Sequence, residues 1–101
     1  MDLAAEWREH QTAPFPYSCL KSAVAGAPLV KLDAEAGACL TASLRTDGVP
    51  RPLSSERRSR LEASRTLIRQ ALRELTLDAG AQAYFERLDR LSQAVLAAPG
   101  R

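Results

Sequence analysis

Seven arginines between residues 51 and 73 are the first feature of this sequence with a candidate chemical role. Four lie along one side of an expected helix and form an arginine stripe interrupted by Glu62: Arg58, Arg65, Arg69 and Arg73. Four crowd the start of the same helix: Arg51, Arg57, Arg58 and Arg60. Guanidinium groups beside the free N–H groups of a helix N-terminus bind phosphates and other anions. The pattern is therefore a candidate anion- or nucleic-acid-binding site.

The same arginines can instead be a solvated helix face. Glu56 and Glu62 partly neutralise them, and the net charge of the whole chain is only +2. Proteins that bind nucleic-acid backbones usually have a larger basic excess. One observation favours the binding site: exposed cations at a helix N-terminus oppose the helix dipole, at a cost of about 0.3–1 kcal/mol each that a bound anion would compensate. We favour the solvated face and keep the binding site as the alternative.

A second candidate site lies near the N-terminus, where three of the five aromatic residues accompany the only histidine. Its residues are Trp7, His10, Phe15 and Tyr17, with prolines at positions 14 and 16. Aromatic side chains dominate binding hot spots, so the segment is a candidate interaction surface for a protein partner. We favour the alternative that Trp7, Phe15 and Tyr17 form a lid over the open side of two long helices.

The sequence offers few groups for catalysis or metal binding. His10 is the only histidine, and Cys19 and Cys39 are the only cysteines, so the usual zinc ligand sets are missing. The sequence contains no glycine-rich phosphate loop and no nucleophile or metalloprotease motif. We therefore expect a protein that is not an enzyme and has no cofactor or metal. Without an export signal, the two cysteines are expected to be buried thiols.

The clearest structural element is the helix that carries the arginines. It follows the prolines at 50 and 52, and Ser54 or Ser55 is a suitable N-cap. A second helix is expected after Asp78, another good N-cap, and ends before Pro99. Apolar residues recur at helical spacing in both: Leu61, Leu67, Ile68, Leu72 and Leu75, then Tyr84, Phe85, Leu88, Leu91, Val95 and Leu96. The short connection predicts an antiparallel helical hairpin over residues 53–98.

Residues 1–50 are expected to form mixed short elements. Leu3 to His10 can form a short helix, and two prolines predict an extended segment over 12–17. A turn signal at 25–28 is followed by alternation that allows a short strand pair near 29–32.

Residues 38–44 fit either a strand or a helix. Ala38, Leu40, Ala42 and Leu44 alternate as in a strand, whereas alanine-rich composition suits a helix. We favour a helix because Asp33 is a good N-cap and Gly48 is a good residue to follow its C-terminus.

Length and composition indicate one small folded domain over residues 1–101. Hydrophobic residues make up 46% and charged residues 26%, as in ordinary globular proteins. The sequence has no apolar run of the roughly 20 residues that a membrane-spanning helix needs, and its first residues are polar. We therefore expect a cytoplasmic protein without membrane contact. Twelve of the fourteen basic residues are arginine, which is typical of bacterial-like, GC-rich coding.

The sequence thus predicts a mainly α fold in which the hairpin packs with one or two shorter N-terminal helices. A short β-hairpin fits this prediction, and an α+β fold is the alternative if residues 38–44 form a strand. The predicted function is a small cytoplasmic, non-catalytic interaction or regulatory protein that forms a homodimer through the helical hairpin. The alternative function is a nucleic-acid or anion-binding module that uses the arginine-rich helix face.

Overall fold

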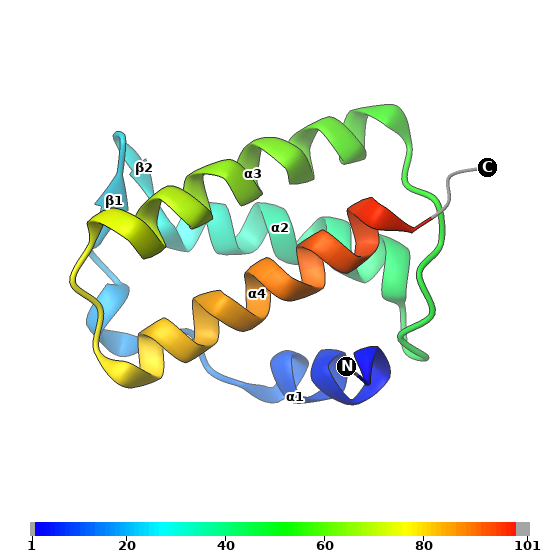
Figure 1. The fold of residues 1–101 in the computed structure, drawn as a ribbon, viewed down its shortest axis with the longest axis horizontal. Helices are drawn as coiled ribbons and strands as arrows, with labels where there is room; N and C mark the ends of the chain where they lie inside the picture. The colour runs from blue at the N-terminus through cyan, green and yellow to red at the C-terminus, as the bar shows by residue number, and fades with distance from the viewer. Residues whose placement is uncertain (1, 99–101) are drawn as a thin grey trace.

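Four helices make up most of residues 2–98, the part of the chain that the computed structural model describes. In chain order the elements are α1 (Leu3–Thr12), the 3-10 turn η1 (Tyr17–Cys19), β1 (Ala23–Val24), β2 (Ala27–Pro28), α2 (Leu29–Leu44), α3 (Ser55–Glu74) and α4 (Ala79–Ala97). Helix α4 contacts each of the other three helices, and α2 also packs against α3 (Figure 1). The mainly α fold predicted from the sequence is therefore confirmed.

Helices α3 and α4 form the predicted antiparallel hairpin (Figure 1). The Ser54 hydroxyl caps α3 by accepting a hydrogen bond from the Arg57 N–H at 3.2 Å. The Asp78 carboxylate caps α4 by accepting from the Ala81 N–H at 2.8 Å. Both caps satisfy backbone donors that have no partner inside their own helix. The hairpin is thus defined by local capping signals together with two apolar faces.

The core lies where the apolar sides of α2, α3 and α4 meet. Leu61 and Ile68 of α3 are fully buried, as are Phe85, Leu88 and Leu91 of α4. Helix α2 contributes four more large buried side chains at helical spacing: Leu29, Leu32, Leu40 and Leu44. Burying a leucine or phenylalanine side chain stabilises the fold by roughly 1.5–3 kcal/mol. This shared core explains why the hairpin requires a third long helix.

Helix α1 covers one side of α4, away from α3 (Figure 1). It extends two residues beyond the expected end, to Thr12. Its buried Trp7 donates a hydrogen bond from Nε1 to the Arg45 carbonyl at 2.7 Å, which ties α1 to the end of α2. Gly48 permits this approach, because its φ is +72° and a Cβ there would lie 2.5 Å from Ala4 Cα. Any larger residue at position 48 would force α1 away from α2.

The strand pair occurs earlier in the chain than predicted. Strands β1 and β2 pair Val24 with Ala27, and residues 29–32 belong to α2. Ala25 and Gly26 both have positive φ, which is the backbone of a tight two-residue hairpin turn. The expectation of strands at 29–32 was wrong because Leu29, Leu32 and Ala36 already start the helical spacing.

Residues 38–44 are helical, so the favoured interpretation of this segment is confirmed. The reason given for it was partly wrong, because Asp33 is not the N-cap of α2 and lies within the helix. Pro28 takes the capping position, without a side-chain hydrogen bond. Gly48 is also not the residue that directly ends the helix, because α2 ends at Leu44 and its C-cap is Arg45, which itself has a positive φ. Gly48 has a positive φ three residues later, and its N–H donates to the Leu44 carbonyl at 2.9 Å. Asp33 is thereby free to contact another helix.

Candidate functional site

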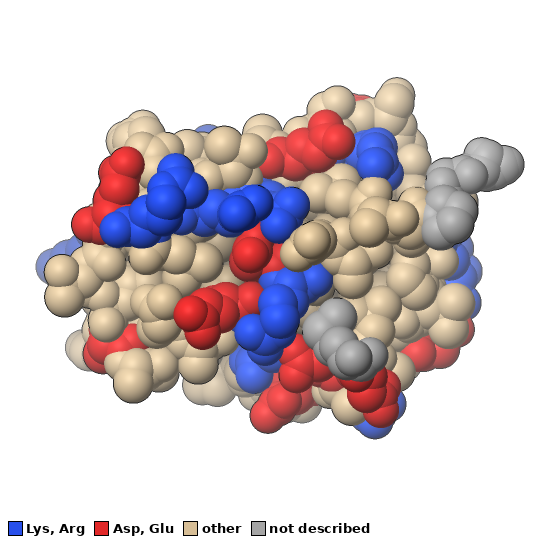
Figure 2. Space-filling model, viewed as in Figure 1, with Lys and Arg blue, Asp and Glu red and all other residues tan. Residues whose placement is uncertain are grey.

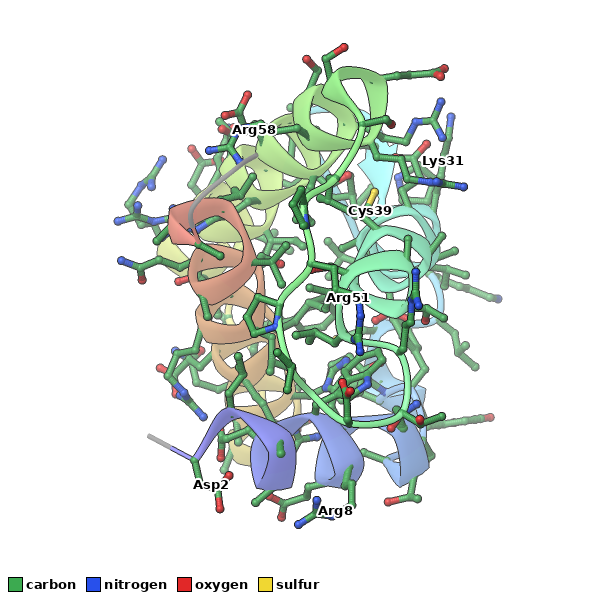
Figure 3. All side chains as sticks on the ribbon, turned by 90° about the vertical axis from the view of Figure 1, so that its right-hand side faces the viewer. Asp2, Arg8, Lys31, Cys39, Arg51 and Arg58 are labelled. Atoms are coloured by element: carbon green, nitrogen blue, oxygen red, sulfur yellow. The ribbon has the colours of Figure 1, made fainter. Side chains whose placement is uncertain are left out.

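One arginine at the start of α3, Arg58, contacts the end of the neighbouring helix α4. Arg58 donates a hydrogen bond from Nη2 to the Leu96 carbonyl at 2.6 Å. Figure 3 shows Arg58 beside the last turn of α4. Carbonyls in the last turn of a helix have no partner within it, and a cation there is favourable for the dipole. The Arg58 charge is unfavourable near the N-terminus of α3. In the antiparallel hairpin it lies at the C-terminus of α4, where it stabilises that helix.

Other basic side chains of this region are paired with carboxylates. Arg65 lies 2.7 Å from Asp89 of α4, and both side chains are only 20% exposed. The remaining pairs connect residues four apart: Arg58 with Glu62, Arg60 with Glu56, and Arg51 with Asp47. The Arg51 guanidinium holds the pKa of the Asp47 carboxyl well below its usual range. These pairs use much of the positive charge that a phosphate ligand would require.

Arg57, Arg69 and Arg73 make no side-chain hydrogen bond or ion pair within residues 2–98. Figure 2 shows basic side chains along α3 with acidic side chains between and beside them. A small hollow of about 260 Å³ is lined by Arg65 and Arg69, but also by Glu62. A carboxylate in the wall disfavours an anion at this position.

The aromatic N-terminal segment is mostly built into the fold. Trp7 and His10 are buried, and the Phe15 ring meets the rings of Tyr84 and Phe85 edge to face, each at 5.9 Å. The lid interpretation holds for Phe15, which packs on α4, whereas Trp7 is buried beside His10 and the end of α2. It is wrong for Tyr17, which is 86% exposed because it starts the 3-10 turn η1 and points away from the core. Burial likewise removes Trp7 and His10 from any interaction surface of the folded chain.

A polar network lies between α1, α2 and α4. The Tyr84 hydroxyl donates to the Asp33 carboxylate at 2.7 Å, and the Tyr84 ring packs against His10 at 4.7 Å. Arg87 donates from Nε to His10 Nδ1 at 3.1 Å and lies 3.9 Å from Glu9. These contacts hold the Tyr84 ring and the Arg87 guanidinium in fixed positions. Both side chains also line a pocket.

Burial and neighbouring charge change the acidity of this network. Burial, reinforced by the Arg87 charge, lowers the pKa of His10 from its usual 6.5 to about 4. Burial raises the pKa of Asp33, although the hydrogen bond from Tyr84 works in the opposite direction. Burial and the contact with Asp33 raise the pKa of Tyr84. At neutral pH, His10 is therefore a neutral acceptor for Arg87, and Tyr84 remains a phenol.

The pocket lies between residues 13–18, which we name the strap, and the first half of α4. It is an open cavity of about 800 Å³. The strap contributes Pro14, Phe15, Pro16 and Tyr17 to one wall, and α4 contributes Gly80, Ala83, Tyr84 and Arg87 to the other. Its size and its aromatic lining are typical of ligand and partner sites. We name this cavity the strap pocket.

A hydrogen bond from Ser18 to the Asp78 carboxylate closes one end of the strap pocket. The same carboxylate caps α4, so a single residue positions both walls. Its two hydrogen bonds lower the pKa of Asp78, which keeps the group anionic. Asp78 was expected only as a helix cap, and its contact with the strap was not predicted.

The two cysteines are buried free thiols, as expected. Cys39 donates from Sγ to the Arg57 carbonyl at 3.5 Å, which connects α2 to the first turn of α3 (Figure 3). Burial raises the pKa of the Cys39 thiol, which disfavours the reactive thiolate. Within residues 2–98 no group of three His, Cys, Asp or Glu side chains is arranged to hold a metal ion. None of the helices described is both long and apolar enough to span a bilayer.

No family model, curated protein or solved structure was found to match this chain. The candidate site therefore depends on its own geometry. Two of its residues, Tyr84 and Arg87, were missed as site residues in the sequence. Tyr84 was predicted as part of the hairpin's apolar face, and the local pattern around Arg87 resembles an ordinary polar helix side. The strap and α4 meet only in the folded chain.

Proposed function

We propose that this chain is a small, non-catalytic interaction protein that holds a segment of a partner protein in the strap pocket. The observation that carries this proposal is an open pocket of about 800 Å³ with an aromatic wall that ends in the exposed Tyr17. Tyrosine combines a large apolar area with a polar tip, which makes it frequent in binding hot spots. We place its action in the cytoplasm, because both cysteines are buried thiols.

The distribution of exposed apolar side chains supports the strap pocket, rather than the helical hairpin, as the binding surface. Four large apolar side chains are exposed in residues 2–98: Tyr17, Leu20, Val30 and Val49. None of them belongs to α3 or α4. The apolar sides of the hairpin are already covered by α2 and α1. A partner that buries apolar area therefore gains more at the strap than at the hairpin.

The chemistry of the pocket suits binding better than catalysis. A catalytic acid or base is most effective when its pKa lies near the working pH. His10 has a pKa of about 4 and its Nδ1 is occupied by Arg87, while the Tyr84 proton is held by Asp33. Each titratable group near the pocket thus has a structural partner. Rigid walls with occupied polar groups favour recognition of an apolar segment.

A library of random linear twelve-residue peptides displayed on phage tests the proposal. Selection against the folded chain should enrich peptides that shift the backbone amide signals of Ala13, Phe15, Tyr17, Ser18 and residues 79–87. Tyr17→Ser should weaken their binding at least about tenfold, equivalent to about 1.4 kcal/mol. Val49→Ser is the matched control, because Val49 is also exposed but lies outside the pocket. Selected peptides that bind elsewhere, or are indifferent to Tyr17→Ser, would contradict the proposal.

A further inference from the structure

The strap pocket has features that specify the chemistry of its occupant. Building on the proposed function, we infer that the pocket binds a proline-containing segment in the polyproline II conformation, flanked by basic residues. Three observations lead to this inference: the length of the pocket, the packing of the chain's own strap, and the charges at the two ends.

The length of the pocket matches one turn of polyproline II helix. Its α4 wall extends from Gly80 to Arg87. At about 1.5 Å per residue this wall is roughly 10 Å long. A polyproline II segment rises about 3.1 Å per residue, so three residues fill that length. An α-helix laid along the same wall would place about two turns against it, and its diameter with side chains is about 10–12 Å.

The strap itself shows which kind of backbone packs on α4. Ala13 has φ −77° and ψ 132°, and Pro16 has φ −59° and ψ 122°, both close to polyproline II values. Phe15, between the two prolines, inserts edge to face between Tyr84 and Phe85. This surface of α4 thus already receives an extended, proline-flanked aromatic segment. A second segment of the same kind can lie in the open groove where the strap meets α4.

The occupant would need few hydrogen bonds, and the pocket offers few. A polyproline II segment has no internal hydrogen bonds, and its prolines lack N–H donors, so it mainly presents carbonyl acceptors. The exposed Tyr17 hydroxyl is available as a donor to such a carbonyl. The Tyr84 hydroxyl already donates to Asp33, so its ring acts as an apolar wall. Aromatic grooves of this composition are a recurrent mode of proline-rich peptide recognition.

An acidic residue, Asp78, lies at one end of the strap pocket, and Arg87, paired with a carboxylate, lies at the other. Asp78 is exposed at the end where α4 begins, and Ser18 fixes its position. At the other end the Arg87 guanidinium is accompanied by Glu9, whose side chain is 67% exposed. Arg87 is only 14% exposed and also donates to His10, so little of its charge is open to a ligand. A basic residue on each side of the proline segment allows one of them to lie beside Asp78 in either chain direction.

Two synthetic peptides test the inference by amide chemical-shift titration of the full chain. The first, Ala-Arg-Pro-Pro-Pro-Arg-Ala with blocked ends, places its arginines about 12 Å apart on either side of three prolines. It should shift the amide signals of Ala13, Phe15, Tyr17, Ser18 and residues 79–87 at low salt. The second replaces both arginines by glutamate and should bind more weakly. Tyr17→Ser should reduce affinity for the first peptide at least about tenfold, and Val49→Ser should leave it unchanged.

Asp78→Asn isolates the charge, because asparagine remains a good N-cap and keeps an acceptor for Ser18. This variant should weaken the binding of the arginine peptide up to about fivefold, as expected for the loss of an exposed ion pair. The affinity for the glutamate peptide should stay the same or increase. The difference should shrink as salt is added.

Two results would separate this inference from the proposed function. If selected library peptides occupy the pocket but the arginine peptide does not, the polyproline II inference is overturned and the proposed function stands. The polyproline II inference is also overturned if an amphipathic helical peptide of leucine, alanine and lysine binds in the pocket more tightly than the arginine peptide. If neither synthetic nor selected peptides shift the pocket residues, both the inference and the proposed function are wrong.

Discussion

Acid should destabilise this protein through His10. The histidine is 93% removed from solvent by α1 and α4, since only 7% of its surface is exposed, and its pKa falls from 6.5 to about 4 in the folded chain. Between these two pH values the unfolded chain binds more protons at this site than the folded chain. The free energy of unfolding therefore rises with pH across this window. The contribution of His10 is fully present above about pH 6.5 and is lost as the pH falls toward 4.

The magnitude follows from the difference between the two pKa values. The two pKa values differ by about 2.5 units, and each unit corresponds to about 1.36 kcal/mol. The loss in the free energy of unfolding that His10 causes is therefore about 3 kcal/mol below pH 4. At pH 5 about 2 kcal/mol of this is already lost relative to pH 8. That loss is large compared with the roughly 5–15 kcal/mol by which domains are usually stable.

Urea unfolding at pH 8 and pH 5, followed by tryptophan fluorescence of Trp7, measures this effect. His10→Gln is the matched control, because its side-chain oxygen can still accept from Arg87 but does not titrate. The pH-dependent loss in the wild type should exceed that in the variant by about 2 kcal/mol, and carboxylates shared by both chains cancel. Equal losses in the two proteins would refute the assigned environment of His10.

Three further predictions concern the core, the thiols and the arginine stripe. Ile68→Ala should lower the free energy of unfolding by roughly 2–5 kcal/mol in urea titrations, and near-zero destabilisation would contradict its complete burial. Cys19 and Cys39 should both react with a thiol reagent after unfolding without reductant, provided air oxidation is prevented; a count of zero would indicate a disulfide. Arg65→Gln should cost about 1 kcal/mol because it breaks the contact with α4, whereas Arg69→Gln should change stability by no more than about 0.5 kcal/mol; equal effects would show that the ion pair contributes nothing.

The hairpin was predictable from the sequence because its signals are local. Ser54 and Asp78 are capping residues whose hydrogen-bond partners lie three residues away. The apolar spacing between them identifies which face of each helix is buried, and the short connection determines their antiparallel order. Such information does not depend on the rest of the chain.

The N-terminal half was only partly predictable because weak local signals competed there. The turn at Ala25 and Gly26 was recognised, but the strands that it joins are only two residues each. Asp33 has the chemistry of a helix cap, yet the chain uses it as the acceptor for Tyr84. A cap and a buried acceptor have the same local sequence, and only the packing of α4 against α2 distinguishes them.

The sequence by itself determined the helical hairpin, the burial of both cysteines and the mainly α class, because periodicity, capping and composition act over a few residues. Only the tertiary structure decided the roles of Arg58, His10 and the strap. Arg58 gains its partner from the end of α4, and His10 contacts Arg87 from a position 77 residues earlier in the chain. The strap pocket exists because Ser18 and Asp78, 60 residues apart, meet when α4 packs against the N-terminal segment.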